Sequence, residues 1–175
     1  QRQMCIRDRL RITPGIECHT HEYIQTGHLD SKFGFDLTQI DDAVELILND
    51  YTNLKLHGLH AHIGSQIFET LIYGDEIEIL VKELVRLDEK FNITLNEINV
   101  GGGLGVKYTN SDVPPSTYEI ADIIIKRLKE CIEKQNAIVS KSEQSVKVDF
   151  DEKTIYNGVA KSFYTCWNEA LSVVK

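Results

Sequence analysis

The fold is decided by residues 58–66, which read Gly-Leu-His-Ala-His-Ile-Gly-Ser-Gln, together with residues 99–105, which read Asn-Val-Gly-Gly-Gly-Leu-Gly. In each stretch a short apolar segment runs into glycine and a few polar side chains. Enzymes built on parallel sheets place their active-site residues in such segments, at the carboxyl ends of the strands. The two stretches therefore predict an α/β enzyme whose site is built from the loops that follow its strands.

Hydrophobic periodicity around these stretches predicts alternating strands and helices. Strands are expected at 10–13, 54–62 and 95–100, and helices at 40–49, 77–91 and 117–133. A polar loop is expected after the first strand, up to about Thr38, and a further strand is possible at 145–150. The repeated order of strand and helix is typical of parallel βαβ units.

Composition and charge narrow the class of protein. The chain has 175 residues, 42% hydrophobic and 26% charged, which is typical of a globular domain. Its net charge of −8 argues against a nucleic-acid groove, which needs a basic face. No apolar run approaches the roughly 20 residues needed to cross a bilayer. The four cysteines are widely spaced, and we interpret them as reduced thiols of a cytoplasmic protein.

His60 and His62 lie two residues apart on an expected strand, so both side chains should be on one face. Three interpretations are open on this pattern alone. The histidines could be half-buried residues with satisfied hydrogen bonds, or zinc ligands of a metal-dependent barrel hydrolase, or part of a cofactor site. The metal interpretation needs further ligands, and no matching site is evident downstream.

The glycines at 101–103 predict a turn that brings backbone close to another group. The loop is not a dinucleotide fingerprint, because Val106 stands three residues after Gly103, where that fingerprint has glycine. It is not a P-loop either, since no Gly-Lys-Ser/Thr follows. A plain turn after a strand and a loop that binds an anion through its amides are both consistent with the pattern.

The two stretches, with a third block, resemble the diaminopimelate decarboxylases. The third block is residues 20–27, Thr-His-Glu-Tyr-Ile-Gln-Thr-Gly, followed by residues 31–35, Ser-Lys-Phe-Gly-Phe. The resemblance covers about residues 10–136 and follows the family's order. It implies a partial (β/α)8 TIM barrel of the alanine racemase and decarboxylase type, with about three βα units of the eight.

The resemblance also implies a cofactor, a reaction and site residues. The family uses pyridoxal 5'-phosphate (PLP) to convert meso-diaminopimelate to L-lysine and CO₂. By match, His62 stacks on the cofactor ring and is the catalytic residue here, Ser65 lies near the phosphate, and Gly101, Gly102 and Gly103 bind it. A cytoplasmic homodimer with an amino-acid substrate is implied, without a metal. Related decarboxylases for arginine, ornithine and carboxynorspermidine are the alternative.

Parts of the family pattern have no match in this chain. The family's Schiff-base lysine lies in a block before the residues seen here, and no such block occurs. The family's Glu-Pro-Gly-Arg block is also absent. We therefore expect an internal fragment that is inactive by itself. We interpret residues 1–9 as an adaptor-like, non-native segment, residues 10–136 as the partial PLP-binding barrel, and residues 137–175 as an unassigned tail.

Overall fold

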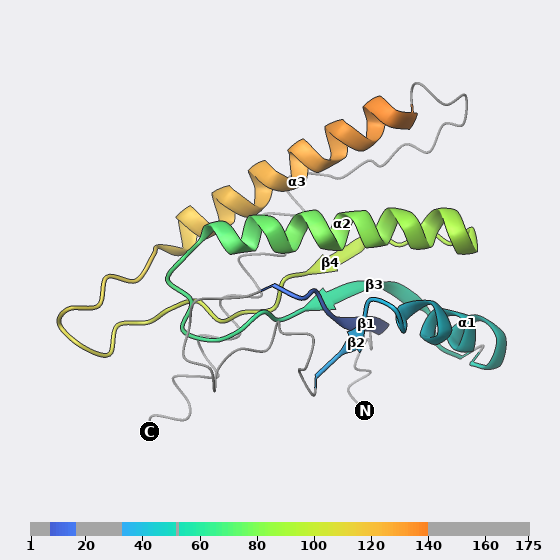
Figure 1. Ribbon diagram of the computed structural model, residues 1–175, viewed down its shortest axis with the longest axis horizontal. Helices are drawn as coiled ribbons and strands as arrows, with labels where there is room; N and C mark the ends of the chain where they lie inside the picture. Colours follow the sequence, from blue (N-terminus) through green and yellow to red (C-terminus); the bar gives the residue numbers. More distant parts are fainter. Residues whose placement is uncertain (1–7, 17–32, 52, 140–175) are drawn as a thin grey trace, which may run out of the picture.

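The computed structural model describes residues 8–16, 33–51 and 53–139, and within them four strands form one parallel sheet (Figure 1). The strands are β1 (Asp8–Thr13), β2 (Phe35–Asp36), β3 (Leu56–Ala61) and β4 (Glu97–Asn99), in the spatial order β2-β1-β3-β4. All three strand pairings are parallel. Parallel neighbours need a crossover connection, and the helix at Leu71–Phe91 supplies it between β3 and β4. The expected succession of parallel βα units is confirmed.

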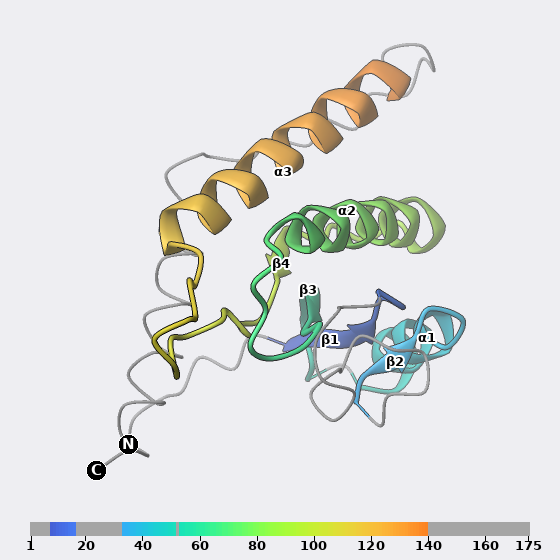
Figure 2. The same cartoon turned by 60° about the vertical axis from the view of Figure 1, so that its left-hand side comes forward.

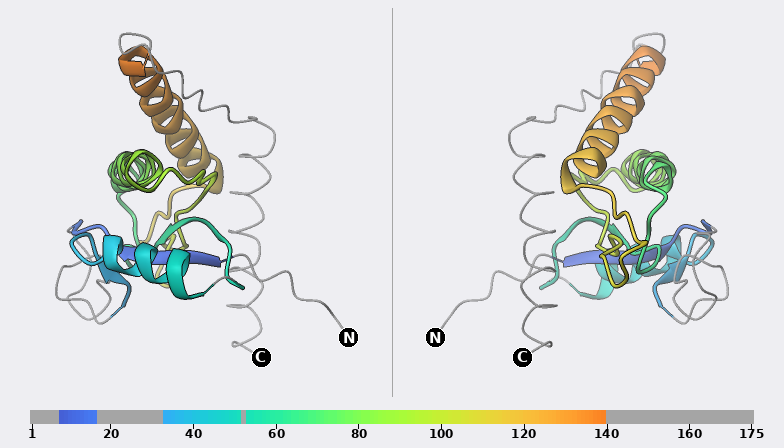
Figure 3. Two further views of the ribbon diagram at one scale, coloured as in Figure 1. Left: turned by 90° about the vertical axis from the view of Figure 1, so that its right-hand side faces the viewer. Right: turned by 90° about the vertical axis from the view of Figure 1, so that its left-hand side faces the viewer.

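Helices in the described residues follow β2, β3 and β4. They are α1 (Ile40–Asp50), α2 (Leu71–Phe91) and α3 (Thr117–Val139). All three contribute to one hydrophobic core, and α3 lies on the far side of α2 from the strands (Figures 2 and 3). In the part of the chain that is described, no helix has the length and apolar character needed to cross a membrane.

The sheet has one apolar face and one polar face because side chains alternate along each strand. Leu10 and Ile12 of β1 are buried beside Leu59 and Ala61 of β3, their partners in register. The residues between them, such as His60, point to the opposite face. The helices therefore pack on the apolar face, and the opposite face carries the polar side chains of the candidate site.

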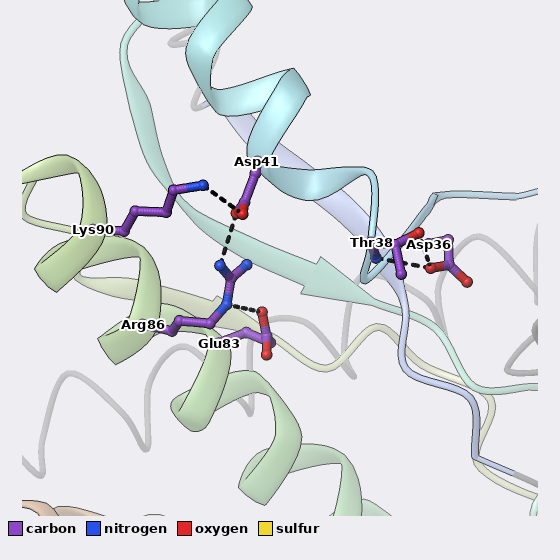
Figure 4. A network of polar contacts seen from close by, with 6 residues as sticks. All are labelled: Asp36, Thr38, Asp41, Glu83, Arg86 and Lys90. Carbon is purple, nitrogen blue, oxygen red and sulfur yellow. Dashed lines mark hydrogen bonds and ion pairs between the residues drawn. The ribbon is translucent and has the colours of Figure 1, made fainter.

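An ion-pair network holds α1 against α2 (Figure 4). Asp41, in the first turn of α1, accepts a hydrogen bond from Lys90 Nζ at 2.8 Å and pairs with Arg86 Nη1 at 2.8 Å. Arg86 Nε also contacts Glu83 at 2.8 Å. These contacts lower the pKa of Asp41, chiefly through the hydrogen bond from Lys90. The network fixes α1 beside α2 at the edge of the core.

The start of α1 is set by a polar turn after β2. Asp36 Oδ1 accepts hydrogen bonds from the backbone N–H and the hydroxyl of Thr38, both at 2.8 Å, also drawn in Figure 4. Such a turn satisfies donors just before the helix. The sequence predicts a loop through Thr38, and that prediction misses the two-residue strand β2. A strand this short has no periodicity to detect, and its pairing with β1 defines it.

Several boundaries differ from the expected ones. β1 begins at Asp8 rather than residue 10, and α2 begins at Leu71 rather than residue 77. Gly74 argues against helix by propensity. Its role is tertiary, since a Cβ there would lie 3.3 Å from Arg127 Nε of α3, so glycine lets the guanidinium lie close to α2. The possible strand at 145–150 lies outside the described residues.

Candidate active site

Two rows of polar side chains cross the sheet on the face opposite the hydrophobic core. Register places Arg9 of β1, Gly58 of β3 and Glu97 of β4 in the first row. Arg9 Nη2 and Nε contact Glu97 Oε2 at 2.6 and 2.8 Å, so this ion pair passes over the middle strand. A Cβ on Gly58 would overlap the Glu97 carbonyl oxygen. Glycine therefore permits both the close approach of β4 and the pair that crosses it.

The second row contains Arg11, His60 and Asn99. Asn99 Oδ1 accepts the backbone N–H of Gly101 at 2.8 Å. His60 Nδ1 lies 3.0 Å from the same oxygen and 3.1 Å from the Asn99 carbonyl oxygen. Since both partners are acceptors, His60 carries its proton on Nδ1. Burial lowers the pKa of His60, and the ring is therefore neutral near pH 7.

His62 stands directly after β3 and beside the glycine loop, residues 101–103. The Gly102 N–H donates to His62 Nδ1 at 3.3 Å. Because Nδ1 accepts, the neutral ring carries its proton on Nε2. Burial lowers the pKa of His62, and the positive charge of Arg11 lowers it further. The contact confirms that this histidine and the glycine loop lie at the same edge of the sheet.

The glycine loop uses backbone conformations that side chains rarely adopt. The φ angle is +68° at Gly101 and +97° at Gly103. A Cβ on Gly101 would lie 2.7 Å from the Ala61 carbonyl oxygen and 2.9 Å from His62 Nδ1. A Cβ on Gly103 would overlap the Gly64 carbonyl oxygen. The loop therefore lies directly against the end of β3 and the turn that follows it, which only glycine permits.

The loops after β3 and β4 pair along their length. Ile67 N–H donates to the Gly103 carbonyl at 2.8 Å, and Gly105 N–H donates to the Ile67 carbonyl at 2.8 Å. The Gln66 side chain extends this pairing, because its Nε2 donates to the Val106 carbonyl at 2.7 Å and its Oε1 accepts the Val106 N–H at 3.0 Å. The Gln66 side-chain amide thus donates and accepts one hydrogen bond each with the Val106 backbone, as a paired strand residue would.

Ser65, the last of the expected site residues, is placed less tightly than His62 and the glycine loop. Ser65 is exposed in the turn after His62. Arg11 lies over the Phe33 ring, with its Cζ 5.0 Å from the ring centroid. The third block, residues 20–27, and Lys32 lie outside the described residues. Within 8–16, 33–51 and 53–139, no cluster of three or more His, Cys, Asp or Glu side chains could hold a metal ion.

Sequence reasoning missed three residues that support the site. Asn99 holds the first glycine amide, Gln66 joins the two loops, and the buried Tyr73 donates from its hydroxyl to the Gly102 carbonyl at 3.1 Å. Asn99 and Gln66 could have been noticed as polar side chains at or just beyond strand ends, inside the two motifs. Tyr73 gives no such signal, because its partner depends on how α2 packs.

The sequence of this chain matches a known protein family. The family described as "Pyridoxal-dependent decarboxylase, pyridoxal binding domain" matches residues 5–144. The chain belongs to this family. The match includes the paired loops, His62 and the glycine loop, and the partial TIM-barrel-like α/β fold expected from the sequence is confirmed.

Two curated relatives are diaminopimelate decarboxylases. The protein from Synechocystis sp. is 49% identical over 131 residues, or 75% of this chain. The protein from Bacillus subtilis is 44% identical over 123 residues, or 69% of this chain. The chain spans 28% of the length of each relative.

Solved structures agree with these relatives. Diaminopimelate decarboxylase from M. jannaschii in co-complex with L-lysine superposes with a TM-score of 0.61 and 30% identity, covering 72% of this chain and 29% of that one. The Helicobacter pylori enzyme complexed with L-lysine gives a TM-score of 0.56 and 31% identity, covering 68% and 29%. The similarity of fold thus extends over about as large a share of the chain as the similarity of sequence.

Proposed function

We propose that this chain forms the part of a PLP site that holds the cofactor phosphate and one face of its ring. The reaction would be the decarboxylation of meso-diaminopimelate to L-lysine and CO₂. One observation carries this proposal: the hydrogen bond from Gly102 to His62 joins a glycine loop and a neutral aromatic ring at one edge of the sheet. Membership of the pyridoxal-dependent decarboxylase family supports it.

The chemistry of the residues present fits PLP. The positive φ angles of Gly101 and Gly103 and the absence of side chains let an anion approach the backbone of this loop closely, and Gly101, Gly102 and Gly103 would hold the phosphate there. The Gly101 and Gly102 amides donate to Asn99 and His62, and these contacts fix the shape of the loop. His62 is half-buried with a lowered pKa, so it offers an uncharged ring that can pack against a pyridine ring. Ser65 would add a hydroxyl near the phosphate.

The chain's own groups prepare this site before any ligand arrives. The Arg11 guanidinium lowers the pKa of both histidines and adds positive charge on the face where an anion would bind. Tyr73 holds the glycine loop from the side of α2. PLP, when bound, supplies an electron sink for the electron pair released as CO₂ leaves.

The substrate is proposed from the relatives, several of which are diaminopimelate decarboxylases. A graft tests it. The matched residues of the Synechocystis enzyme are replaced by those of this chain, and formation of L-lysine from meso-diaminopimelate is measured. The graft is expected to decarboxylate diaminopimelate and to leave L-arginine and L-ornithine unconverted. A folded graft that binds PLP but prefers arginine or ornithine would overturn the substrate assignment.

We further propose that the protein works in the cytoplasm as a homodimer, on the basis of its resemblance to the family. Light scattering of the purified graft tests the homodimer, and fractionation of cells that produce the protein tests its location in the cytoplasm. A monomeric graft that is fully active would overturn the dimer.

A further inference from the structure

A single side-chain oxygen, Asn99 Oδ1, contacts two groups at the candidate site. It accepts the Gly101 N–H at 2.8 Å and lies 3.0 Å from His60 Nδ1. Asn99 is the last residue of β4, so a strand fixes its backbone. Gly101 is the first residue of the glycine loop and has a φ of +68°. The side chain thus joins a rigid strand to the start of a loop whose conformation is uncommon.

These contacts determine how the two histidines carry their protons. A backbone N–H can only donate, so Gly101 orients the Asn99 amide with its oxygen toward the loop. His60 must then donate from Nδ1, which leaves its Nε2 unprotonated. His62 receives the Gly102 N–H on Nδ1 and carries its proton on Nε2. The two histidines of the motif are therefore held as opposite tautomers, His60 by Asn99 and His62 by the glycine loop.

We propose that Asn99 is a positioning residue that sets the backbone of Gly101, and through it the anion-binding shape of the glycine loop. His60 supports Asn99 from the neighbouring strand, which leaves His62 as the ring that faces a ligand. The inference rests on the proposed function only for the identity of that ligand. If Asn99 only stabilised the fold, substitution of another polar residue of the same segment, such as Asn96, would affect Gly101 equally.

Nuclear magnetic resonance of the full chain tests the positioning role directly. Asn99→Ala should speed hydrogen exchange of the Gly101 amide roughly five- to tenfold, since one hydrogen bond is lost. His60 should keep its Nδ1 proton, because the Asn99 carbonyl oxygen still accepts it at 3.1 Å. Unchanged exchange at Gly101 would overturn the proposal.

A second variant covers the case in which Asn99→Ala does not fold. Asn99→Asp keeps an acceptor for both groups but adds a negative charge beside His60. Gly101 should stay protected and the pKa of His60 should rise, because an anion stabilises the imidazolium. Asn96→Ala is the matched control, since Asn96 is exposed just before β4. A fixed His60 pKa in Asn99→Asp, or equal loss of Gly101 protection in Asn96→Ala, would contradict the role.

Ligand titration separates this inference from the proposed function. PLP and pyridoxal, which lacks the phosphate, are titrated into the wild-type chain and into Asn99→Ala. We expect the variant to lose several-fold affinity for PLP and to keep its affinity for pyridoxal. If the wild-type chain binds neither ligand, the proposed function fails. Hydrogen exchange of the Gly101 amide and the pKa of His60 then decide the role of Asn99 without a ligand. Equal loss for both ligands would overturn phosphate positioning.

Discussion

Glu76 should make the protein less stable as the pH rises. This side chain of α2 is fully buried, and within the described residues neither of its carboxylate oxygens has a hydrogen-bond partner. Burial raises the pKa of Glu76 well above its usual value of 4.5. The cause is desolvation, because a charge without a partner is costly in a medium of low dielectric constant.

The sign and size of the effect follow from proton linkage. Below the unfolded-state pKa both states are protonated, and the contribution of this carboxyl to stability is fully present. As the pH rises above about 4.5, the unfolded chain ionises first, and the free energy of unfolding falls by about 1.4 kcal/mol per pH unit. The fall ends once the pH has passed the raised folded-state pKa of Glu76.

Urea unfolding between pH 5 and pH 8 measures this slope. Glu76→Gln should remove the contribution of this residue to the slope, and Glu76→Leu should also raise the free energy of unfolding at pH 7 by about 1–3 kcal/mol, since no polar group stays buried without a partner. Glu78→Gln is the matched control, because Glu78 lies on the same helix and its side chain is 54% exposed. If Glu76→Gln keeps the wild-type slope, the carboxyl is not the cause.

Four further predictions concern the loops and the cofactor. Gly103→Ala should lower the free energy of unfolding by about 3 kcal/mol or more, through its positive φ and its overlap with a neighbouring carbonyl. The matched Gly74→Ala should be neutral or stabilising in the same urea assay, because the nearest group to its Cβ is the flexible Arg127 side chain and Ile123 lies at an ordinary contact distance. Tyr73→Phe should cost about 1 kcal/mol of unfolding free energy, because the loop carbonyl loses its donor. In the grafted enzyme, His62→Ala should weaken PLP binding by about 1 kcal/mol and reduce turnover more, whereas His60→Ala should reduce turnover less; equal loss of activity with loss of a bound metal would favour the hydrolase alternative. Borohydride reduction of this chain with PLP, followed by peptide mapping, should give no single dominant lysine adduct, and stoichiometric labelling of one lysine would contradict that expectation.

Periodicity predicted the elements that bury an apolar face. β3, the second half of α2, β4 and most of α3 were expected because each has a clear pattern of apolar residues. The two motifs were placed correctly at strand ends, since glycine and polar residues directly after an apolar run are typical of the carboxyl end of a parallel strand. Resemblance to a known family, rather than periodicity, supplied the cofactor and the roles proposed for His62 and the glycine loop.

Contacts that depend on strand register could not be predicted from the sequence. Arg9 and Glu97 are 88 positions apart, and their ion pair exists because β1 and β4 both flank β3 at Gly58. The contact between Asn99 and His60 exists because the two residues are partners in register. No local pattern encodes which residues of distant strands face each other, so these contacts become visible only when the sheet is assembled.

The pairing of the two loops also bears on how the site opens. Gln66 and Ile67 connect the turn after β3 to the backbone from Gly103 to Val106 through four hydrogen bonds. Neither loop can move away without breaking bonds to the other, so the two should open as one cooperative unit. Admission of a ligand would then be governed by a single opening equilibrium. A substitution in either loop should change the on-rate and off-rate of a ligand held by the other.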